Sequence, residues 1–251
     1  MSHSHTATEQ GLDFETGAAT HVGLARTENE DSFLAAPAQG LWAVADGMGG
    51  LDDGKLASQT LVETLATLVP TRDTTAAHHA LETLVARANE RIREIAAERG
   101  NRMMGTTLVA VLAAGSEYVC AWAGDSRVYR LRDGTLAQIT RDHSEVQELL
   151  DQGVITAEQA SKWPRRNAIT RAVGVTEDVR LEARSEALRP GDTFLLCSDG
   201  LTRHVADHEI AEALATRDPQ AACDALIATT LERGAGDNVT IVIARAKLAG
   251  G

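Results

Sequence analysis

The stretch from Leu41 to Gly50 constrains the fold of this chain more than any other. An apolar run of strand length ends abruptly in a carboxylate, Asp46, and then in glycines that free the backbone. A carboxylate at the end of a buried strand is costly to desolvate unless hydrogen-bond donors or a cation compensate it. The stretch therefore predicts a strand whose end needs a positive partner.

The same pattern recurs along the chain, where acidic residues stand at the ends of other strand-like runs. They are Glu30 and Asp31 before 32–36, Asp125 after 118–124, Asp199 after 193–198, and Asp237 before 239–244. A single Asp-Gly is usually a turn, but this many acidic strand ends with almost no basic neighbours indicate a shared counter-ion. Oxygen ligands without Cys or His suit hard cations such as Mg²⁺, Mn²⁺ or Ca²⁺ rather than Zn²⁺ or Cu²⁺.

Hydrophobic periodicity predicts strands and helices in alternating groups. Strands are expected near 20–24, 31–36 and 41–45, within 106–140, and over 179–187, 192–197 and 239–244. Between them, one helix pair has apolar stripes over 61–69 and 81–96, and a second pair includes a helix that starts at Asp218-Pro219 and stops near Gly234. Thr74 or Thr75 is the expected cap of the helix around 81–96, and Arg132-Asp133-Gly134-Thr135 reads as a hairpin turn. This order implies antiparallel sheets covered by helix pairs, an α+β fold.

Composition limits the choice of partners. The 251-residue chain carries 36 acidic and 24 basic residues, a formal net charge of −12, which argues against nucleic acid or an anionic membrane as a partner. No apolar run approaches the roughly 20 residues that span a bilayer, and the N-terminus lacks the apolar core of a signal peptide. Cys120, Cys197 and Cys223 form no CxxC pair and are expected to be reduced core thiols. We therefore expect a cytoplasmic protein.

Several segments together resemble the metal-dependent Ser/Thr protein phosphatases of the PPM (type 2C) family, in its compact bacterial form. In chain order they are Arg26 to Asp31, Val44 to Gly50, Gly105-Thr106-Thr107, Ala123 to Tyr129, Leu136 to Ser144, Ile169 to Gly174, Ser198 to Leu201 and Asp237 to Thr240. Each segment alone is weak, whereas the ordered set is specific and covers most of the chain.

The resemblance implies a four-layer αββα sandwich, in which two antiparallel sheets are flanked by helix pairs and a flap lies near 144–168. It also implies a single catalytic domain over 17–247. Residues 1–16 are polar and patternless, so we expect a disordered N-terminal extension that includes His3 and His5. Within the flap, the basic stretch from Lys162 to Arg166 either binds the rest of a phosphorylated substrate or is a solvated surface loop.

The resemblance also assigns roles at the metal site. In the family pattern Asp46 bridges two divalent ions, and the carbonyl of Gly47 adds a ligand. Asp199 and Asp237 complete the shell of one ion. Hydrolysis of a phosphate monoester then uses a metal-activated water, and the expected catalytic residues are Arg26, Asp46 and Asp199.

Further residues complete this set. Glu30 or its neighbour Asp31 would serve the second ion through bound waters, and Asp125 with Asp199 matches a third position seen in bacterial members. The expected cofactor is thus two or three ions of Mn²⁺ or Mg²⁺. Arg26 matches the phosphate-binding arginine, because its planar fork can hold two phosphate oxygens, although a surface salt bridge would also account for it.

One departure from the family concerns the general acid. Many eukaryotic members have a histidine at the position of Met48, and a methionine cannot protonate a leaving alcohol. His143 and His204 lie within matching segments but are read first as structural histidines.

The predicted function is that of a metal-dependent protein serine/threonine phosphatase that reverses a bacterial Ser/Thr kinase, acts on phosphorylated proteins and is a monomer. A catalytically weak phosphoprotein-binding pseudophosphatase is the alternative. A cysteine-dependent phosphatase is suggested by the Cys-x5-Arg spacing of Cys197 and Arg203, but its phosphate loop would contain Asp199. A calcium-binding structural domain is a third alternative, but the sequence contains no twelve-residue Asp-rich loop of the EF-hand kind.

Overall fold

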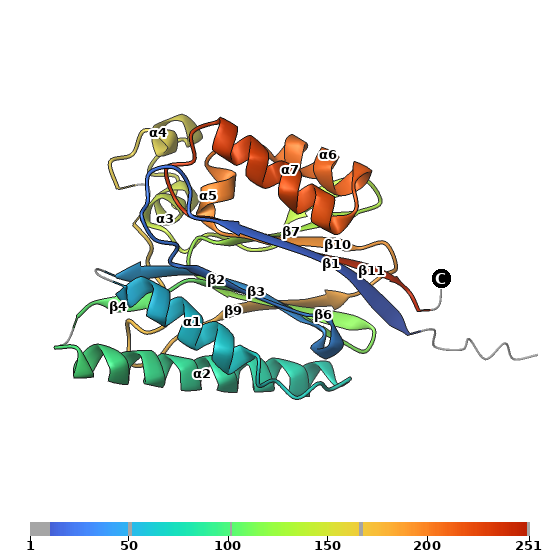
Figure 1. Ribbon diagram of the computed structural model, residues 1–251, viewed down its shortest axis with the longest axis horizontal. Helices are drawn as coiled ribbons and strands as arrows, with labels where there is room; N and C mark the ends of the chain where they lie inside the picture. The colour runs from blue at the N-terminus through green and yellow to red at the C-terminus, as the bar shows by residue number, and fades with distance from the viewer. Residues whose placement is uncertain (1–10, 50–51, 101, 166–167, 250–251) are drawn as a thin grey trace, which may run out of the picture.

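The computed structural model describes residues 11–49, 52–100, 102–165 and 168–249. His3, His5, Gly50 and Arg166, which the sequence analysis singles out, lie outside these ranges. The described chain forms two stacked antiparallel sheets with helices on both outer faces (Figure 1). This arrangement confirms the predicted αββα sandwich.

One sheet, called here the β1 sheet, has five antiparallel strands. In spatial order they are β1 (Leu12–His21), β11 (Val239–Leu248), β10 (Thr193–Cys197), β7 (Arg127–Arg132) and β8 (Thr135–Gln138). Asp133 and Gly134 both have positive φ in the turn between β7 and β8, as expected for the predicted hairpin. Helices α5 (Asp199–Thr202), α6 (Asp207–Thr216) and α7 (Pro219–Glu232) cover the outer face of this sheet.

The other sheet, called the β3 sheet, contains six strands. They are β2 (Asp31–Ala36), β3 (Leu41–Gly49), β5 (Leu108–Ala114), β6 (Glu117–Ala123) and β9 (Glu182–Ala187) in spatial order, with β4 (Met104–Thr106) paired to the end of β3. A 3₁₀ turn, Pro37–Gln39, links β2 to β3. Helices α1 (Asp53–Leu65) and α2 (Thr74–Glu98) pack on the outer face.

Strand β3 shows how the sequence places the site. Leu41, Ala43 and Ala45 belong to the core against α1 and α2, whereas Trp42 and Val44 belong to the core between the two sheets. Side chains alternate across a strand, so Asp46 continues the row that faces the other sheet. The dry core between the sheets thus ends at a carboxylate.

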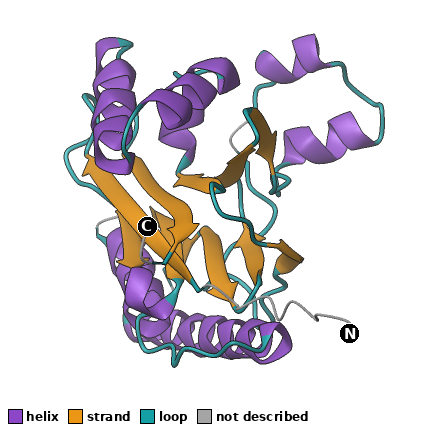
Figure 2. Cartoon of the chain, turned by 90° about the vertical axis from the view of Figure 1, so that its right-hand side faces the viewer, coloured by secondary structure: helices purple, strands orange, loops and turns teal. Residues whose placement is uncertain are grey.

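The flap is a separate pair of short helices, α3 (Glu145–Asp151) and α4 (Ala157–Ser161). Figure 2 shows this pair projecting from the body of the molecule. The predicted capping box at the start of α4 is present: the Thr156 hydroxyl accepts from the Gln159 N–H, and the Gln159 side chain accepts from the Thr156 N–H.

Two sequence expectations need correction, the start of the first strand and the cap of α2. The first strand is Leu12–His21 rather than 20–24, so residues 12–16 are not part of a disordered extension: Leu12 to Thr16 pair with Leu248 to Ala244 of β11. The cap of α2 is Asp73, whose carboxylate accepts from the Ala76 N–H at 2.8 Å, rather than Thr74 or Thr75.

No helix within the described ranges combines the length and apolarity that a membrane crossing requires.

Candidate active site

Acidic side chains from both sheets meet at one end of the sandwich. Asp31 and Asp46 lie directly opposite each other where β2 and β3 pair. Asp199 follows β10, Asp237 precedes β11, and β10 and β11 are neighbours in the other sheet. Asp125 lies between β6 and β7. The structure therefore brings together the acids that the sequence pattern singled out.

The central member of this group is Asp46. Its pKa is raised well above the ordinary value, first by burial and then by the negative charges of four other carboxylates: Asp31, Asp199, Asp125 and Asp237. The backbone of Asp46 is fixed on both sides: its N–H donates to the Thr107 hydroxyl at 2.9 Å, and its carbonyl accepts from the Thr107 N–H at 2.8 Å. These bonds show why threonines matter at the start of β5.

Burial raises the pKa of the other acids as well. The pKa values of Asp31 and Asp125 are both raised to about 7, mainly by desolvation. The pKa values of Asp199 and Glu30 are also raised, with burial as the largest cause. The protein thus holds these groups where negative charge is unfavourable unless a cation is near.

Within this group of acids, two buried carboxylate oxygens lack a hydrogen-bond donor among the described residues. Asp31 Oδ2 accepts a hydrogen bond from the Ser198 hydroxyl at 2.7 Å, yet Asp31 Oδ1 accepts none from the described residues. Asp199 Oδ1 is likewise buried without a donor among the described residues. Such groups are rare in folded proteins, and a bound cation would supply the partner that each oxygen lacks.

Close backbone approach requires glycine beside Asp46. A Cβ atom on Gly47 would lie 2.1 Å from the carbonyl oxygen of Gly54, in the first turn of α1. Similarly, a Cβ atom on Gly200 would lie 2.0 Å from the carbonyl oxygen of Asn238. The glycines of both Asp-Gly pairs are therefore required for packing: Gly47 lies within β3 and Gly200 within α5, so neither turns the chain.

Asn238 organises the loop before β2, a role that the sequence analysis did not predict. Its Oδ1 accepts from the Glu30 N–H at 2.9 Å, and its Nδ2 donates to the carbonyl oxygens of Val22 and Glu28, each at 2.9 Å. A single buried amide thus joins β11 to the segment that carries Arg26, Glu30 and Asp31. The contacts span more than two hundred residues in sequence, so no local pattern announces them.

Two arginines contact the acids. Arg26 lies against Asp237, with Nε 2.9 Å from Oδ1 and a second bond of 3.1 Å to Oδ2. Arg203 lies between two carboxylates: it forms an ion pair with Asp199 and donates to Asp237 Oδ2 at 3.0 Å. In the sequence, Arg203 stands out only through its Cys-x5-Arg spacing from Cys197. The missed signal was its position four residues after Asp199, which is the spacing of an ion pair on a helix.

The donor set fits a hard divalent cation. Several carboxylates converge, two of their buried oxygens lack donors among the described residues, and no cysteine or histidine stands among these acids. Among the described residues, however, no three acidic, His or Cys side chains are already closed around one point. The Arg203 guanidinium lies between Asp199 and Asp237, so an ion that uses both carboxylates has to displace it.

His143 does not join the acids. His143 is buried, its Nδ1 accepts from the Gly124 N–H at 3.2 Å, and its Nε2 lies 3.1 Å from Glu182. The ring also stacks on Trp122. Burial lowers its pKa, which suits the expected structural role. The backbone carbonyl of His204 accepts a hydrogen bond from Arg233.

Cys197 cannot serve as a nucleophile. The residue is fully buried, and burial raises the pKa of its thiol to about 12. A reactive cysteine needs the opposite, an exposed thiol with a lowered pKa. Cys120 and Cys223 are also free and buried, as expected for core thiols.

The basic stretch of the flap is largely paired within the flap itself. Lys162 lies 3.1 Å from Glu158, Arg165 lies 3.2 Å from Glu145, and the Trp163 indole donates to Glu145. These contacts favour the interpretation as a solvated surface loop over a dedicated phosphate-binding loop.

An αββα sandwich with clustered carboxylates at one end defines the metal-dependent phosphatase class. The chain belongs to the protein phosphatase 2C family, whose sequence model matches residues 23–246. The chain is 42% identical over 226 residues to the serine/threonine protein phosphatase PstP of Mycobacterium tuberculosis. This match covers 88% of the chain but only 43% of PstP, so the chain spans less than half of that relative.

Solved structures of similar proteins share the fold over nearly the whole chain. PppA, described as a key regulatory component of T6SS in Pseudomonas aeruginosa, superimposes with a TM-score of 0.86 at 44% identity, covering 94% of this chain and 100% of that one. The catalytic domain of PstP in complex with two manganese ions gives a TM-score of 0.86 at 39% identity, with the same coverage of 94% and 100%.

Proposed function

We propose that this chain is a protein serine/threonine phosphatase that uses Mn²⁺ or Mg²⁺ to hydrolyse phosphoserine and phosphothreonine. The observation that carries this proposal is the group of carboxylates around Asp46. Their charges raise the pKa of Asp46, and Asp31 and Asp199 each have one buried oxygen without a donor among the described residues. Family membership supports it, as do the names of the relatives. The phosphoprotein substrates, a cognate Ser/Thr kinase, a cytoplasmic location and a monomeric state are part of the same proposal.

The residues divide into ligands and a phosphate-binding group. Asp46, Asp199 and Asp237 would hold one ion, while the Gly47 carbonyl with Glu30 or Asp31 would hold a second. Bound divalent ions supply the positive charge that offsets the transferring phosphoryl group and make water a nucleophile at neutral pH.

Asp125 lies near Asp199 and would support a third ion, as the family pattern implies. After burial, the negative charge of Asp199 is the second cause of the raised pKa of Asp125, so the two carboxylates share a need for a cation. The number of ions, two or three, therefore depends on whether Asp199 is shared between a third ion and one of the first two.

Arg26 would bind substrate phosphate. Its guanidinium already holds both oxygens of Asp237 and is about half exposed, with a side-chain exposure of 53%. A planar fork of this kind suits two phosphate oxygens equally well. Met48 carries no proton to donate, so the leaving alcohol takes its proton from solvent at the site rather than from that side chain.

The pseudophosphatase alternative is disfavoured by the residues themselves. A domain that keeps the fold without turnover has no need to retain costly buried acids, yet Asp46, Asp199 and Asp237 are all present and close together.

The test is hydrolysis of a phosphothreonine peptide by the metal-free protein, with and without added Mn²⁺, and again with excess EDTA. We expect phosphate release that requires Mn²⁺ and stops with EDTA. Bound Mn²⁺ detected by calorimetry without any release would instead favour a phosphoprotein-binding role, and release that resists EDTA would contradict the metal-dependent mechanism.

A further inference from the structure

A pocket lies beside the acids, at the end of strand β3. Its cavity of about 420 Å³ is within the range of about 300–1,000 Å³ that is usual for ligand sites. Its walls come from Met48, from Met103 just before β4, and from residues 169–172, 175–176 and 178–180 of the loop between the flap and β9. The lining is mostly apolar, and none of the proposed metal ligands belongs to it.

Strand geometry connects this pocket to the proposed metal site. Asp46 and Met48 are two residues apart on β3, so their side chains emerge on the same face, about 6.6 Å apart along the strand. The end of the Met48 side chain approaches Gly105, where a Cβ atom would lie 3.6 Å from Met48 Cε and 2.7 Å from Val175 Cγ2. Met48 and Val175 thus converge over the backbone of β4, immediately beyond Asp46.

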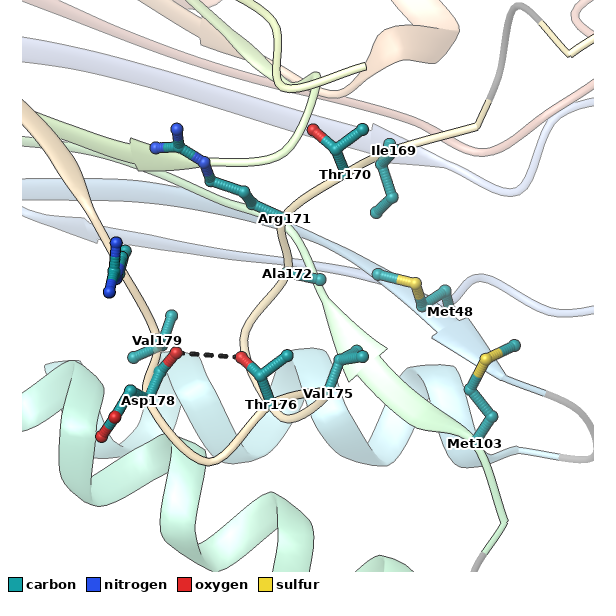
Figure 3. Close-up of a pocket in the computed structure, with 11 residues that line it drawn as sticks. Met48, Met103, Ile169, Thr170, Arg171, Ala172, Val175, Thr176, Asp178 and Val179 are labelled. Atoms are coloured by element: carbon teal, nitrogen blue, oxygen red, sulfur yellow. Dashed lines mark hydrogen bonds between the residues drawn. The ribbon is translucent and has the colours of Figure 1, made fainter. Parts of the chain in front are cut away.

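Apolar side chains are unusually exposed at this place. Met103 is 73% exposed and Val175 is 48% exposed, and both line the pocket. Figure 3 shows Met48, Met103 and Val175 on one side of the pocket with Ile169 above them, while the Arg171 side chain extends to the other side. Single exposed apolar residues are common on protein surfaces, but a group that lines one cavity indicates a binding surface. Methionine suits such a surface because its flexible side chain adapts to different partners.

The charges at the pocket suit an anionic segment. Arg171 and Arg180 line it and are exposed, against a single acidic lining residue, Asp178. This local excess of positive charge stands out in a chain with a net charge of −12. A phosphorylated peptide is therefore a better electrostatic match to the pocket than a basic one.

We propose that this pocket binds an apolar side chain of the substrate, located two residues from the phosphorylated serine or threonine. An extended peptide advances about 6.6 Å per two residues and points alternate side chains in the same direction, which matches the spacing of Asp46 and Met48. The occupant is thus a stretch of unfolded substrate rather than a cofactor. This inference rests on the proposed phosphatase function, and it gives Met48 a role in substrate selection.

The experiment compares phosphothreonine peptides that differ at one position. Peptides carry Leu, Ala or Lys either two residues before or two residues after the phosphothreonine, and kcat/KM is measured for each with saturating Mn²⁺. We expect the Leu peptide of one series to exceed its Ala counterpart about 10-fold, which is the usual gain for filling an apolar pocket, and the Lys peptide to be poorest. Hydrolysis of p-nitrophenyl phosphate, which is too small to reach the pocket, is measured in parallel.

Variants then test whether the preference for the Leu peptide arises in this pocket. In the double variant Met103→Ser, Val175→Ser, the ratio of Leu to Ala peptide should fall close to one. Both side chains are exposed, so the change should not disturb the core. Val69→Ser is the matched control, because Val69 is 80% exposed but does not line the pocket, and it should keep the wild-type ratio.

The outcomes separate the two proposals. Hydrolysis of p-nitrophenyl phosphate together with equal rates on the Leu and Ala peptides of both series would overturn the pocket assignment and leave the proposed function in place. A Leu preference that survives the double variant would also overturn it. Failure to hydrolyse any phosphorylated compound would overturn the proposed function and this inference with it.

Discussion

Strand β10 has an aspartate at each end, and the surroundings of the two differ. Asp192 precedes the strand with its side chain fully buried, and Arg132 binds both of its oxygens at 2.6 Å while the Arg189 N–H donates to Oδ2 at 2.8 Å. Asp199 follows the strand, and its buried Oδ1 has no donor among the described residues. Burial alone therefore does not distinguish the proposed metal ligand from the structural carboxylate. The two differ in how far hydrogen-bond donors and cations compensate their charge.

The largest expected difference between Asp192 and Asp199 is the effect of their replacement on turnover. Replacing Asp199 by Asn should lower kcat by about 10³-fold or more, because several kcal/mol of charge stabilisation in the transition state depend on ions held there. Asp192→Asn is the matched control, since it makes the same change at the other end of β10. Its kcat per folded molecule, measured with p-nitrophenyl phosphate, should stay within about 3-fold of wild type. Comparable losses in the two variants would contradict the distinction.

The stability of the metal-free protein should show the reverse order. Asp192→Asn weakens a buried, fully bonded ion pair and leaves Arg132 with an uncompensated charge, so we expect the free energy of unfolding to fall by about 3 kcal/mol. Asp199→Asn removes a carboxylate that is repelled by its neighbours, so its free energy of unfolding in EDTA should be equal to wild type or higher. Urea unfolding of both variants in EDTA measures this difference, and a greater loss of stability in Asp199→Asn would refute the comparison.

The dependence of stability on pH provides a third test of the comparison. Burial raises the pKa of Asp31 to about 7 in the folded protein, against about 4 in the unfolded chain. The folded state therefore keeps a proton that the unfolded state releases, so the contribution of Asp31 to metal-free stability is fully present below about pH 4, falls as pH rises toward 7 and is lost above it. The side chains of Ser198 and Thr240 reduce this shift, and the charges of Asp199 and Asp237 add to it.

The expected loss between pH 5 and pH 8 in EDTA is on the order of 2 kcal/mol from this group. Asp125, with a pKa also near 7, contributes with the same sign. The slope should diminish in Asp31→Asn and after addition of Mn²⁺, because bound cations favour the ionised carboxylates. Urea unfolding at both pH values measures it. A metal-free protein that gains stability over this interval would show that these acids are not held in unfavourable surroundings.

The sequence predicted the site's acids because each stands at the end of an apolar run, a pattern that is local and needs no knowledge of the fold. It predicted β1 poorly, although Leu12 and Phe14 alternate with Asp13 and Glu15 as an edge strand should. The polar residues of that alternation are the more exposed ones, and they make the segment resemble a polar extension.

Contacts between distant segments account for what the sequence could not predict. The Asn238 amide fixes the loop before β2 through bonds to Val22, Glu28 and Glu30, and nothing near position 238 indicates those partners. Arg203 is an intermediate case. Its pairing with Asp199 follows from helical spacing, whereas its bond to Asp237 depends on β10 and β11 being neighbours.

The smallest expected effect concerns Arg203, the one positive partner that Asp199 has among the described residues. Its guanidinium joins Asp199 to Asp237, so it occupies the place where a divalent ion would use both carboxylates. Replacement by Gln removes this competing cation and should tighten Mn²⁺ binding about 10-fold, the equivalent of one partly exposed ion pair of about 1.4 kcal/mol. Isothermal titration calorimetry on the metal-free protein measures the dissociation constant without reference to activity.

Arg91→Gln is the matched control for this change. It removes the same charge from an exposed ion pair, Arg91 with Glu94, on α2, a helix that carries none of the acids. The control should leave the Mn²⁺ dissociation constant within about 2-fold of wild type, since exposed charges are largely screened at ordinary ionic strength. If Arg203→Gln binds Mn²⁺ as weakly as the control or more weakly, Arg203 supports the loaded site instead of competing for it. The Asp199 end of β10 would then resemble the Asp192 end, with an arginine as a permanent partner.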